Sequence, residues 1–420
     1  MKTELFSREL LTKIRDSFHY VQKSPYAGKR IFFDSVSGSL RLKKMGERAA
    51  EEVVSYAQKS RVDPASEHFA RVKEQFKQDA RLFFGADSGY IMPAMSGTHA
   101  LYRCVNAVCA AAEDGDNIVT TSLDHPAVFE ATYQFAQKYN LERRVVDFNN
   151  KSGRVPPENV LAEIDADTRL LVIIHGSNVT GAVNDIKSIV KRAREKNPQI
   201  YVVVDGVQYA PHGLIDVEDL DIDAYVVSGY KIYCKKGSGI AYINERFDEL
   251  PHWQFRERPA GEWALGAEDE STYAGFSAVI DYLKWLGGQF TDSQEERVLL
   301  ETAMKKIKAH TRALLQMALT GTEEYTGLRQ LERVRVLGFE DDLKDRTGLI
   351  AWEAESHNSR DLAEAYFEQG NISLSTRERN IYGRHILKTL GVENLVRTSL
   401  CHYNSPREIS RFLQVTAEII

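Results

Sequence analysis

The chain has 420 residues, more than one hydrophobic core usually supports, so we expect two structural domains. Hydrophobic residues make up 43% and charged residues 27% of the sequence, proportions that are ordinary for a globular enzyme. The net charge of −6 is spread along the chain and leaves no basic stripe, which argues against a nucleic-acid-binding protein.

The N-terminal segment, residues 1–30, is predicted to form a helix followed by an arm. Its first 21 residues have the pattern of a charged amphipathic helix, and no apolar core follows Lys2 as a signal peptide would require. No stretch approaches the ~18 uninterrupted apolar residues of a membrane span. The four cysteines form no C-x-x-C pair, which argues against a disulfide framework and a zinc site. We therefore expect a soluble, cytoplasmic protein with no bound metal and no membrane partner.

From residue 31 to about 280, short apolar runs alternate with helical patterns, which predicts an α/β fold with a mainly parallel sheet. We assign residues 31–290 to a large domain. Its strands are predicted from β-branched runs bounded by polar residues, at 118–121, 170–174, 200–204 and 224–227. The short turn before 239–243 favours an antiparallel strand there. Helices are predicted at 42–59, 66–84, from Thr98 onward, and from His125 to Asn140.

Residues 291–420 are predicted to form a linker helix and a small C-terminal α/β domain. The helix is expected over 291–318, with a cap at Thr291, Asp292 or Ser293 and a capping box completed by Glu295 or Glu296. The small domain begins near residue 319. Its predicted elements are strands near 331–337 and 347–353, a helix at 359–369, and a final helix opened by Ser405-Pro406-Arg407-Glu408.

Chemically useful side chains follow three neighbouring predicted strands. Asn178 comes after the strand at 170–174, Asp205 after the next strand, and Lys231 after the third. Ligands of an open α/β sheet bind beyond the carboxyl ends of its strands, so these side chains are expected at one edge. A lysine and a nearby carboxylate are what pyridoxal phosphate needs: the lysine forms a Schiff base, and the carboxylate pairs with the pyridinium nitrogen. Burial beside a cationic ring would keep the lysine partly deprotonated.

A phosphate site is expected where Ser96-Gly97-Thr98 opens a helix, because free backbone N–H groups at a helix N-terminus bind anions. His125 starts another helix at the same edge, where its imidazole would stack on a cofactor ring. Each residue alone has a more ordinary explanation, such as a helix cap or a packing histidine. The residues alone therefore leave the cofactor open. A dinucleotide-binding fold is disfavoured because no G-x-G-x-x-G follows the first strand.

Several motifs together resemble the class V aminotransferase family, the group that contains the cysteine desulfurases. They are D-G-V-Q-Y-A-P-H (205–212), S-G-Y-K-I-Y (228–233), G-S-G-I (237–240), F-F-D-S-V-S-G-S (32–39), M-S-G-T-H-A (95–100), S-L-D-H-P-A (122–127), S-N-V-T-G (177–181) and V-R-T-S-L-C-H-Y-N-S (396–405). The resemblance covers nearly the whole chain in collinear order. It implies the aspartate-aminotransferase-like fold (PLP fold type I), pyridoxal 5'-phosphate as cofactor, an amino-acid substrate, and a homodimer with sites at the subunit interface.

The resemblance also implies a role for each matching residue. The cofactor ring would be held by Lys231 as Schiff-base lysine and proton shuttle, Asp205 at the ring nitrogen, Gln208 at the phenolic oxygen, and His125 stacked on the ring. The phosphate would be bound by Ser96, Gly97, Thr98 and Ser228. The substrate carboxylate would lie near Asn178 and be clamped by Arg377 through a bidentate pair, with Arg379 as a competing candidate.

The sequence departs from the family pattern at two places near the cofactor. Tyr230 stands where the family usually has histidine, although its hydroxyl could still reach the phosphate. The segment 266–268 reads Gly-Ala-Glu where the family has Gly-Thr-Pro, whose threonine reaches a phosphate across the dimer; Thr272 is a candidate substitute. The acidic residues 268–270 on this expected active-site loop would favour a cationic substrate group, although a solvated loop is a commoner explanation.

A third departure concerns the reaction. A cysteine desulfurase needs a mobile, exposed cysteine, which the family carries in the small domain, and residues 319–400 contain none. Cys401 is expected to be buried, and Cys234 to face backbone on a turn. We therefore expect a cysteine desulfurase-like lyase that releases a β-substituent without a persulfide cysteine. The alternative is an aminotransferase that uses a keto acid. A non-catalytic binding subunit of the same fold is a third reading, which the intact lysine, aspartate and histidine argue against.

Overall fold

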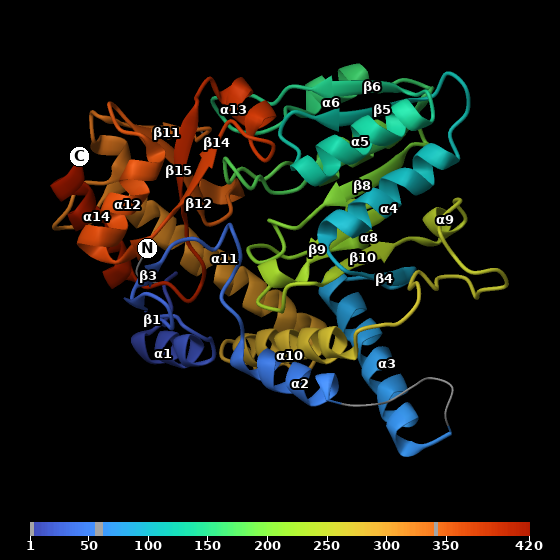
Figure 1. The fold of residues 1–420 in the computed structure, drawn as a ribbon, viewed down its shortest axis with the longest axis horizontal. Coiled ribbons are helices and arrows are strands. Elements are labelled where there is room, and N and C mark those ends of the chain that lie inside the picture. The colour runs from blue at the N-terminus through green and yellow to red at the C-terminus, as the bar shows by residue number, and fades with distance from the viewer. Residues whose placement is uncertain (1–3, 55–61, 340–342) are drawn as a thin grey trace.

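The computed structural model describes residues 4–54, 62–339 and 343–420. Its centre is a seven-stranded sheet in the order β4-β10-β9-β8-β7-β5-β6 (Figure 1). The bounds of these strands are β4 Tyr90–Ala94, β5 Asn117–Thr121, β6 Glu142–Val146, β7 Thr168–Ile174, β8 Tyr201–Asp205, β9 Ala224–Ser228 and β10 Gly239–Ile243. The strands from β9 to β6 pair in parallel, whereas β10 pairs antiparallel with β4 and β9. The predicted mainly parallel sheet and its antiparallel strand are confirmed.

Both faces of this sheet are covered, which explains why its strands read as continuous apolar runs rather than alternating ones. Val203 and Val226 pack with residues of α4 (Gly97–Ala110) and α5 (Pro126–Lys138) on one face. Their neighbours Val204 and Val227 pack on the other face, with α7 (Ile186–Lys196) and α10 (Glu270–Gly287). Successive side chains along a strand therefore contribute alternately to two hydrophobic cores, one on each face of the sheet.

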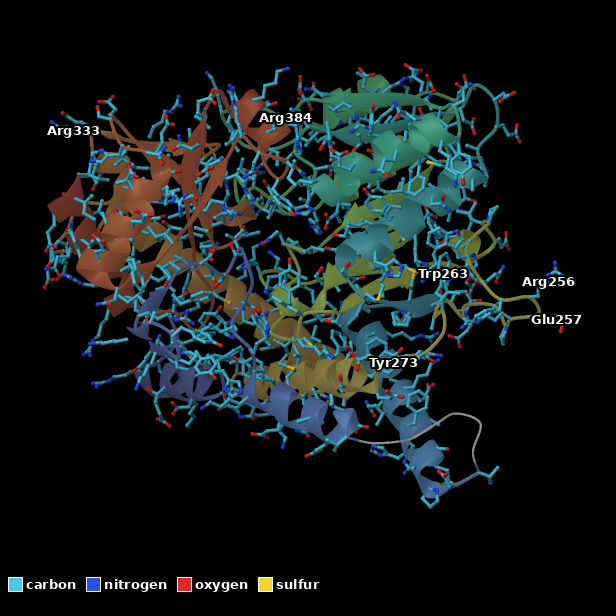
Figure 2. The ribbon with its side chains drawn as sticks, viewed as in Figure 1. Arg256, Glu257, Trp263, Tyr273, Arg333 and Arg384 are labelled. Atoms are coloured by element: carbon cyan, nitrogen blue, oxygen red, sulfur yellow. The ribbon has the colours of Figure 1, made fainter. Side chains whose placement is uncertain are left out.

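The remaining helices complete this part of the molecule. They are α2 Lys43–Val53, α3 Pro64–Phe84, α6 Pro157–Glu163, α8 Val217–Leu220 and α9 Glu245–Asp248. The predicted helix at 42–59 corresponds to α2, and residues 55–59 of that prediction lie outside the described residues. The loop after α9 carries Arg256 and Glu257 outward, and Trp263 and Tyr273 return inward to buried positions (Figure 2). Among the described residues, no helix combines the length and apolar character that crossing a membrane requires.

A second sheet of four antiparallel strands, in the order β11-β12-β15-β14, lies at the C-terminal end of the chain. Its elements are β11 Val334–Leu337, β12 Leu349–Ala354, β14 Ser375–Glu378 and β15 Asn394–Ser399, with helices α12 Ser359–Gly370, α13 Arg384–Leu390 and α14 Pro406–Ile419. The predicted strands near 331–337 and 347–353 are present as β11 and β12. The predicted final helix opened by Ser405-Pro406-Arg407-Glu408 is present as α14, and Ser405 and Glu408 form a capping box at its start.

The long helix before this sheet, α11 (Glu296–Thr320), begins later than predicted. Its N-cap is Glu295, which makes no side-chain capping hydrogen bond, so the predicted cap at residues 291–293 is wrong. The reason is local: the hydroxyl of Thr291 accepts the N–H of Ser293, and the hydroxyl of Ser293 accepts the N–H of Glu295. These side chains stabilise the turn before the helix instead of its first N–H groups.

The N-terminal arm connects with the C-terminal part of the chain. Helix α1 (Arg8–Asp16) brings Arg15 to Glu408, with 3.0 Å between guanidinium nitrogen and carboxylate oxygen. Strand β3 (Ile31–Phe32) pairs in parallel with β13 (Ile372–Ser373), and the short strands β1 (Lys23–Ser24) and β2 (Gly28–Lys29) form a hairpin before it. The arm thus leads residues 34–40 toward the region between the two sheets, where the candidate site lies.

Candidate active site

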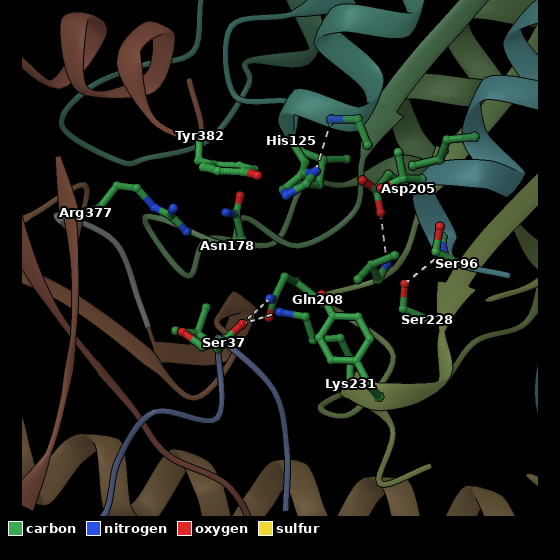
Figure 3. A pocket seen from close by; sticks show the side chains of 18 of the residues that line it. Ser37, Ser96, His125, Asn178, Asp205, Gln208, Ser228, Lys231, Arg377 and Tyr382 are labelled. Carbon is green, nitrogen blue, oxygen red and sulfur yellow. Dashed lines mark hydrogen bonds between the residues drawn. The ribbon is translucent and has the colours of Figure 1, made fainter. Parts of the chain in front are cut away.

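A cavity of about 420 Å³ lies beyond the carboxyl ends of β7, β8 and β9 and is closed on one side by β14 and β15 (Figure 3). Every residue predicted to contact the cofactor or substrate within one chain lines this cavity except Arg379. The lining residues that sequence analysis named are Ser96, Gly97, Thr98, His125, Asn178, Asp205, Gln208, Ser228, Tyr230, Lys231 and Arg377. The carboxyl ends of neighbouring strands therefore bring the predicted side chains together, as expected for a parallel sheet.

Lys231 lies in a single helical turn directly after β9 and is 7% exposed. Its amine donates a hydrogen bond to the carbonyl of Val36, which also accepts a 2.8 Å hydrogen bond from the Gln208 amide. Burial, with the nearby charge of Arg397, lowers the pKa of Lys231 to about 7. At neutral pH much of this amine is therefore uncharged, the form that acts as a nucleophile or base.

Asp205 ends β8 beside this amine. One of its carboxylate oxygens accepts the backbone N–H of Val207 at 3.0 Å. Burial raises the pKa of Asp205 to about 7, and repulsion from Asp124 adds to the shift, against a smaller opposing effect of Lys231. An ionised Asp205 is thus costly without a further cation. A protonated ring nitrogen would supply that cation, so the carboxylate fits the predicted cofactor.

His125 is the N-cap of α5, and its Nδ1 accepts the backbone N–H of Ala127 at 3.1 Å. A neutral imidazole in this position therefore carries its proton on Nε2. Burial lowers the pKa of His125 to about 3, with the positive charge of Lys231 and Arg377 acting in the same direction. The ring is consequently uncharged at neutral pH. A flat, uncharged ring can stack on an aromatic cofactor.

The first turn of α4 forms an anion cradle. Ser96 caps the helix by accepting the N–H of His99 at 3.0 Å, which leaves its hydroxyl proton for another acceptor. The N–H of Gly97 points to the hydroxyl oxygen of Ser228, 3.2 Å away. A Cβ at position 97 would lie 2.4 Å from that oxygen, so only glycine allows this approach. Thr98 is exposed toward the cavity at the same turn.

The structure separates the two arginine candidates. Arg377, on β14, lines the cavity, and its buried Nε has no hydrogen-bond partner in the described part of the chain. Arg379 lies outside the lining: its Nε donates to the carbonyl of Val392 at 3.0 Å, and its Nη1 is 2.7 Å from the carboxylate of Glu393. Of these two candidates, only Arg377 is therefore placed to bind a ligand in this cavity.

Arg397, on β15, is a cavity residue that sequence analysis missed. It is 3% exposed, and its Nη1 donates to the backbone carbonyl of Asn178 at 3.0 Å. Burial, reinforced by the charge of Arg377, lowers its pKa to about 9. A signal was available, because this arginine is the second residue of the motif at 396–405 that carries part of the family resemblance. The side-chain oxygen of Asn178 is buried beside it without a hydrogen-bond partner among the described residues.

Tyr230 and Tyr382 also line the cavity. The ring of Tyr230 lies against Gly38, where an added Cβ would be 3.2 Å from the ring, and its centroid is 5.0 Å from the amine of Lys231. Tyr382 was not predicted. It follows β14 in a turn whose sequence, Arg-Asn-Ile-Tyr-Gly, shows no motif that would have marked it.

The acidic residues 268–270 were expected on an active-site loop, which stays a prediction, because they do not line the cavity that holds Lys231 in the single chain. Glu268 and Asp269 line a different cavity. Glu268 lies 2.9 Å from the amine of Lys73, and Asp269 lies 2.5 Å from that of Lys235. The hydroxyl of Thr272 donates to Asp269 at 3.0 Å. Neighbouring lysines thus balance these carboxylates, and a contact of Thr272 with a phosphate across a dimer stays a prediction.

All four cysteines are free and buried, and none lines the cavity. Burial raises the pKa of the Cys104 and Cys109 thiols to about 12 and that of Cys234 and Cys401 to about 11. The expected burial of Cys401 is confirmed, and Cys234 is buried as well. None of these thiols has the exposure or the lowered pKa that marks a nucleophilic cysteine.

A family model described as aminotransferase class-V matches residues 31–412. The chain belongs to the class-V aminotransferase family. This membership confirms the resemblance drawn from the motifs, and it identifies the cofactor as pyridoxal phosphate, which class-V aminotransferases and cysteine desulfurases use.

Two similar proteins of this family are named as cysteine desulfurases. A probable cysteine desulfurase from Pseudomonas putida is 29% identical over 343 residues, which cover 78% of this chain and 77% of the relative. A cysteine desulfurase from Salmonella choleraesuis is 27% identical over 315 residues, covering 71% of this chain and 70% of the relative.

Solved structures confirm the fold of this class-V family member. An apo cysteine desulfurase from Thermococcus onnurineus superimposes with a TM-score of 0.82 at 21% identity, covering 97% of this chain and 98% of the other. An Escherichia coli cysteine desulfurase gives 0.80 at 19% identity, covering 99% and 98%. The predicted PLP fold type I is therefore correct.

Proposed function

We propose that this class-V family enzyme is a lyase that breaks a bond at the β-carbon of a cysteine-like amino acid and uses no thiol of its own. The observation that carries the proposal is a contrast within the structure. Lys231, with its pKa lowered to about 7, lies in a cavity that also holds two arginines, whereas each cysteine is buried elsewhere with a raised pKa.

The lining residues fit pyridoxal phosphate. Lys231 would hold it as a Schiff base, Asp205 would pair with the ring nitrogen, and His125 would stack on the ring. Ser96, Gly97, Thr98 and Ser228 would bind the phosphate at the N-terminus of α4. The bound cofactor supplies an electron sink that weakens the bonds to the amino acid's α-carbon.

The other cavity residues would bind the substrate. Arg377 and Arg397 present two guanidinium groups, and a carboxylate can accept a bidentate pair from either. The buried, unpartnered oxygen of Asn178 offers an acceptor for the substrate's amino group. Once the amine of Lys231 is free, its lowered pKa lets it accept the α-proton at neutral pH.

Persulfide transfer would need a thiolate that reaches the sulfur of the substrate. Burial keeps the pKa of every cysteine in this chain at about 11 or above, and none lies in the cavity lining. The sulfur of a cysteine substrate would therefore leave as a free species rather than on the enzyme. This feature distinguishes the proposal from the activity named for the relatives.

The test is a product assay on the holoenzyme with L-cysteine and no added keto acid. We expect pyruvate, ammonia and sulfide in equal amounts, at a rate that iodoacetamide treatment leaves unchanged. Formation of alanine with sulfane sulfur bound to protein would indicate a desulfurase and contradict the proposal. A strict requirement for a keto acid would indicate the alternative, an aminotransferase.

We also infer that the enzyme works in the cytoplasm as a homodimer. Its four free cysteines suit a reducing compartment. Met95, before α4, and Leu265, beside the segment 266–268 that the family resemblance places at the dimer interface, are exposed apolar residues that line the same cavity as Glu268. Light scattering on the purified holoenzyme should give about twice the chain mass of 47.6 kDa.

A further inference from the structure

Tyr382 reaches into the candidate active site from the turn between β14 and α13. Figure 3 shows its hydroxyl directed inward, toward the side of the cavity that holds His125, while Lys231 enters from the opposite side. The residue is 53% exposed, so the phenol contacts both the cavity and solvent. No role has been given to it so far.

The turn that carries Tyr382 is built together with Arg377. The side-chain oxygen of Asn380 accepts the backbone N–H of Tyr382 at 2.9 Å, and its carbonyl accepts the N–H groups of Gly383 and Arg384 at 3.1 and 2.9 Å. Gly383 packs on the aliphatic part of Arg377 so closely that a Cβ would lie 2.8 Å from it. The guanidinium and the phenol are thus presented to the cavity as one unit.

We propose that Tyr382 is the acid that protonates the departing β-substituent, an inference that rests on the proposed lyase function. Lys231 is occupied with the α-proton in that reaction, and Asp205 with the cofactor ring. The other phenol of the cavity, Tyr230, is buried, and burial raises its pKa, which makes it a weaker acid. His125 is uncharged and so lacks the proton that an imidazolium would give.

The proton transfers balance with cysteine as substrate. The Cα–H bond breaks and its proton goes to Nζ of Lys231, and the Cβ–S bond breaks with its electron pair on sulfur. The O–H of Tyr382 then gives its proton to that sulfur, the phenolate takes a proton from solvent on its exposed side, and Lys231 returns its proton to solvent. One water hydrolyses the aminoacrylate that remains. In total, cysteine and one water become pyruvate, ammonia and hydrogen sulfide.

The leaving group provides the test, since sulfide needs a proton to depart easily and chloride does not. We would compare Tyr382→Phe with wild-type holoenzyme on L-cysteine and on β-chloro-L-alanine. We expect kcat on cysteine to fall about 100-fold or more, the usual contribution of a general acid, and the rate on β-chloroalanine to stay within about threefold. Exchange of the substrate α-proton with deuterated water, which needs only Lys231, should persist, as should the visible absorbance of the cofactor.

Ile381→Ala is the matched control, because Ile381 is the 77% exposed neighbour in the same turn and lies outside the cavity lining. It should behave as wild type on both substrates. Equal losses on cysteine and β-chloroalanine in Tyr382→Phe, or no loss on either, would overturn the role of Tyr382 while leaving the lyase proposal intact. Wild-type enzyme that exchanges no α-proton and forms no pyruvate would overturn the lyase proposal, and the inference with it.

Discussion

Replacing Lys231 with methionine should stabilise the cofactor-free protein at neutral pH while it removes the group on which the proposed chemistry depends. The pKa of Lys231 lies at about 7, against an ordinary value of 10.5. At about 1.4 kcal/mol for each pKa unit, the shift costs the folded state about 5 kcal/mol when the amine is fully charged, and about 4 kcal/mol at pH 7, where about half of the folded molecules hold it uncharged. The main cause is desolvation, with repulsion from Arg397 second. Methionine has a similar length and no charge to bury.

The stabilisation gained by removing the buried charge is partly offset by the loss of a hydrogen bond. The hydrogen bond from Lys231 to the carbonyl of Val36 disappears, at a cost of about 1 kcal/mol. That carbonyl is not left unpaired, because the Gln208 amide still donates to it at 2.8 Å. The expected net effect is a stabilisation of about 3 kcal/mol at pH 7.

The pH dependence follows from the sign of the shift. Lys231 binds its proton less tightly in the folded than in the unfolded chain, so between pH 7 and 10.5 the unfolded state holds more protons and wild-type stability rises with pH. The penalty is fully present below pH 7 and disappears toward pH 10.5. The advantage of the methionine variant should therefore shrink to less than about 1 kcal/mol by pH 9.5.

Urea denaturation of the cofactor-free proteins measures the difference in free energy of unfolding between the methionine variant and wild type at pH 7 and at pH 9.5. Lys236→Met is the control, because Lys236 is exposed and only five residues away, and it should show no such difference. A Lys231→Met variant that is no more stable than wild type at pH 7, or whose advantage does not change with pH, would refute the reasoning about the buried amine.

Three further predictions concern the site. Arg377→Ala should raise KM for the amino acid at least about tenfold by removing a guanidinium from the cavity, whereas Arg379→Ala should change it less than about twofold, as steady-state kinetics would show. Gly97→Ala should weaken cofactor binding at least about tenfold in a spectroscopic titration, because its Cβ would lie 2.4 Å from the Ser228 hydroxyl oxygen. A variant with alanine at all four cysteine positions should keep its rate of pyruvate formation within about threefold, provided that circular dichroism shows it folded.

Each of these three predictions would be contradicted by a specific result. Equal effects of the two arginine substitutions would remove the distinction drawn from their surroundings. Normal cofactor affinity in Gly97→Ala would show that the close approach at the start of α4 is not needed for binding. Loss of pyruvate formation from the folded cysteine-free protein would reassign sulfur chemistry to an enzyme thiol.

The predictable part of the site follows from the architecture of a parallel sheet. Buried strands such as β8 and β9 can be predicted from the sequence because both of their faces are apolar. Since they run in parallel, their carboxyl ends lie at the same edge of the sheet. Asp205 and Lys231 could therefore be placed together without a structure. The glycine at position 97 was informative for a similar reason, since a helix start that binds an anion needs close backbone approach.

The parts that were missed depend on contacts between distant segments. Arg397 and Tyr382 reach the cavity because the second sheet lies against the strand ends of the first, which no local pattern encodes. The ion pairs of the acidic residues near 268 were missed because their lysine partners, Lys73 among them, lie far away in the sequence. The cap of α11 was missed because Thr291 and Ser293 bond within the preceding turn. In each case local sequence fixes the residue type but not its partner.

The central claim is that Lys231 binds the cofactor covalently, and borohydride reduction of the holoenzyme tests it most directly. Reduction should fix the phosphopyridoxyl group on a single peptide, and fragmentation should locate it on Lys231, with no label in Lys231→Met. A label on another lysine of the wild-type enzyme, or none at all in a protein that still shows cofactor absorbance, would contradict the account.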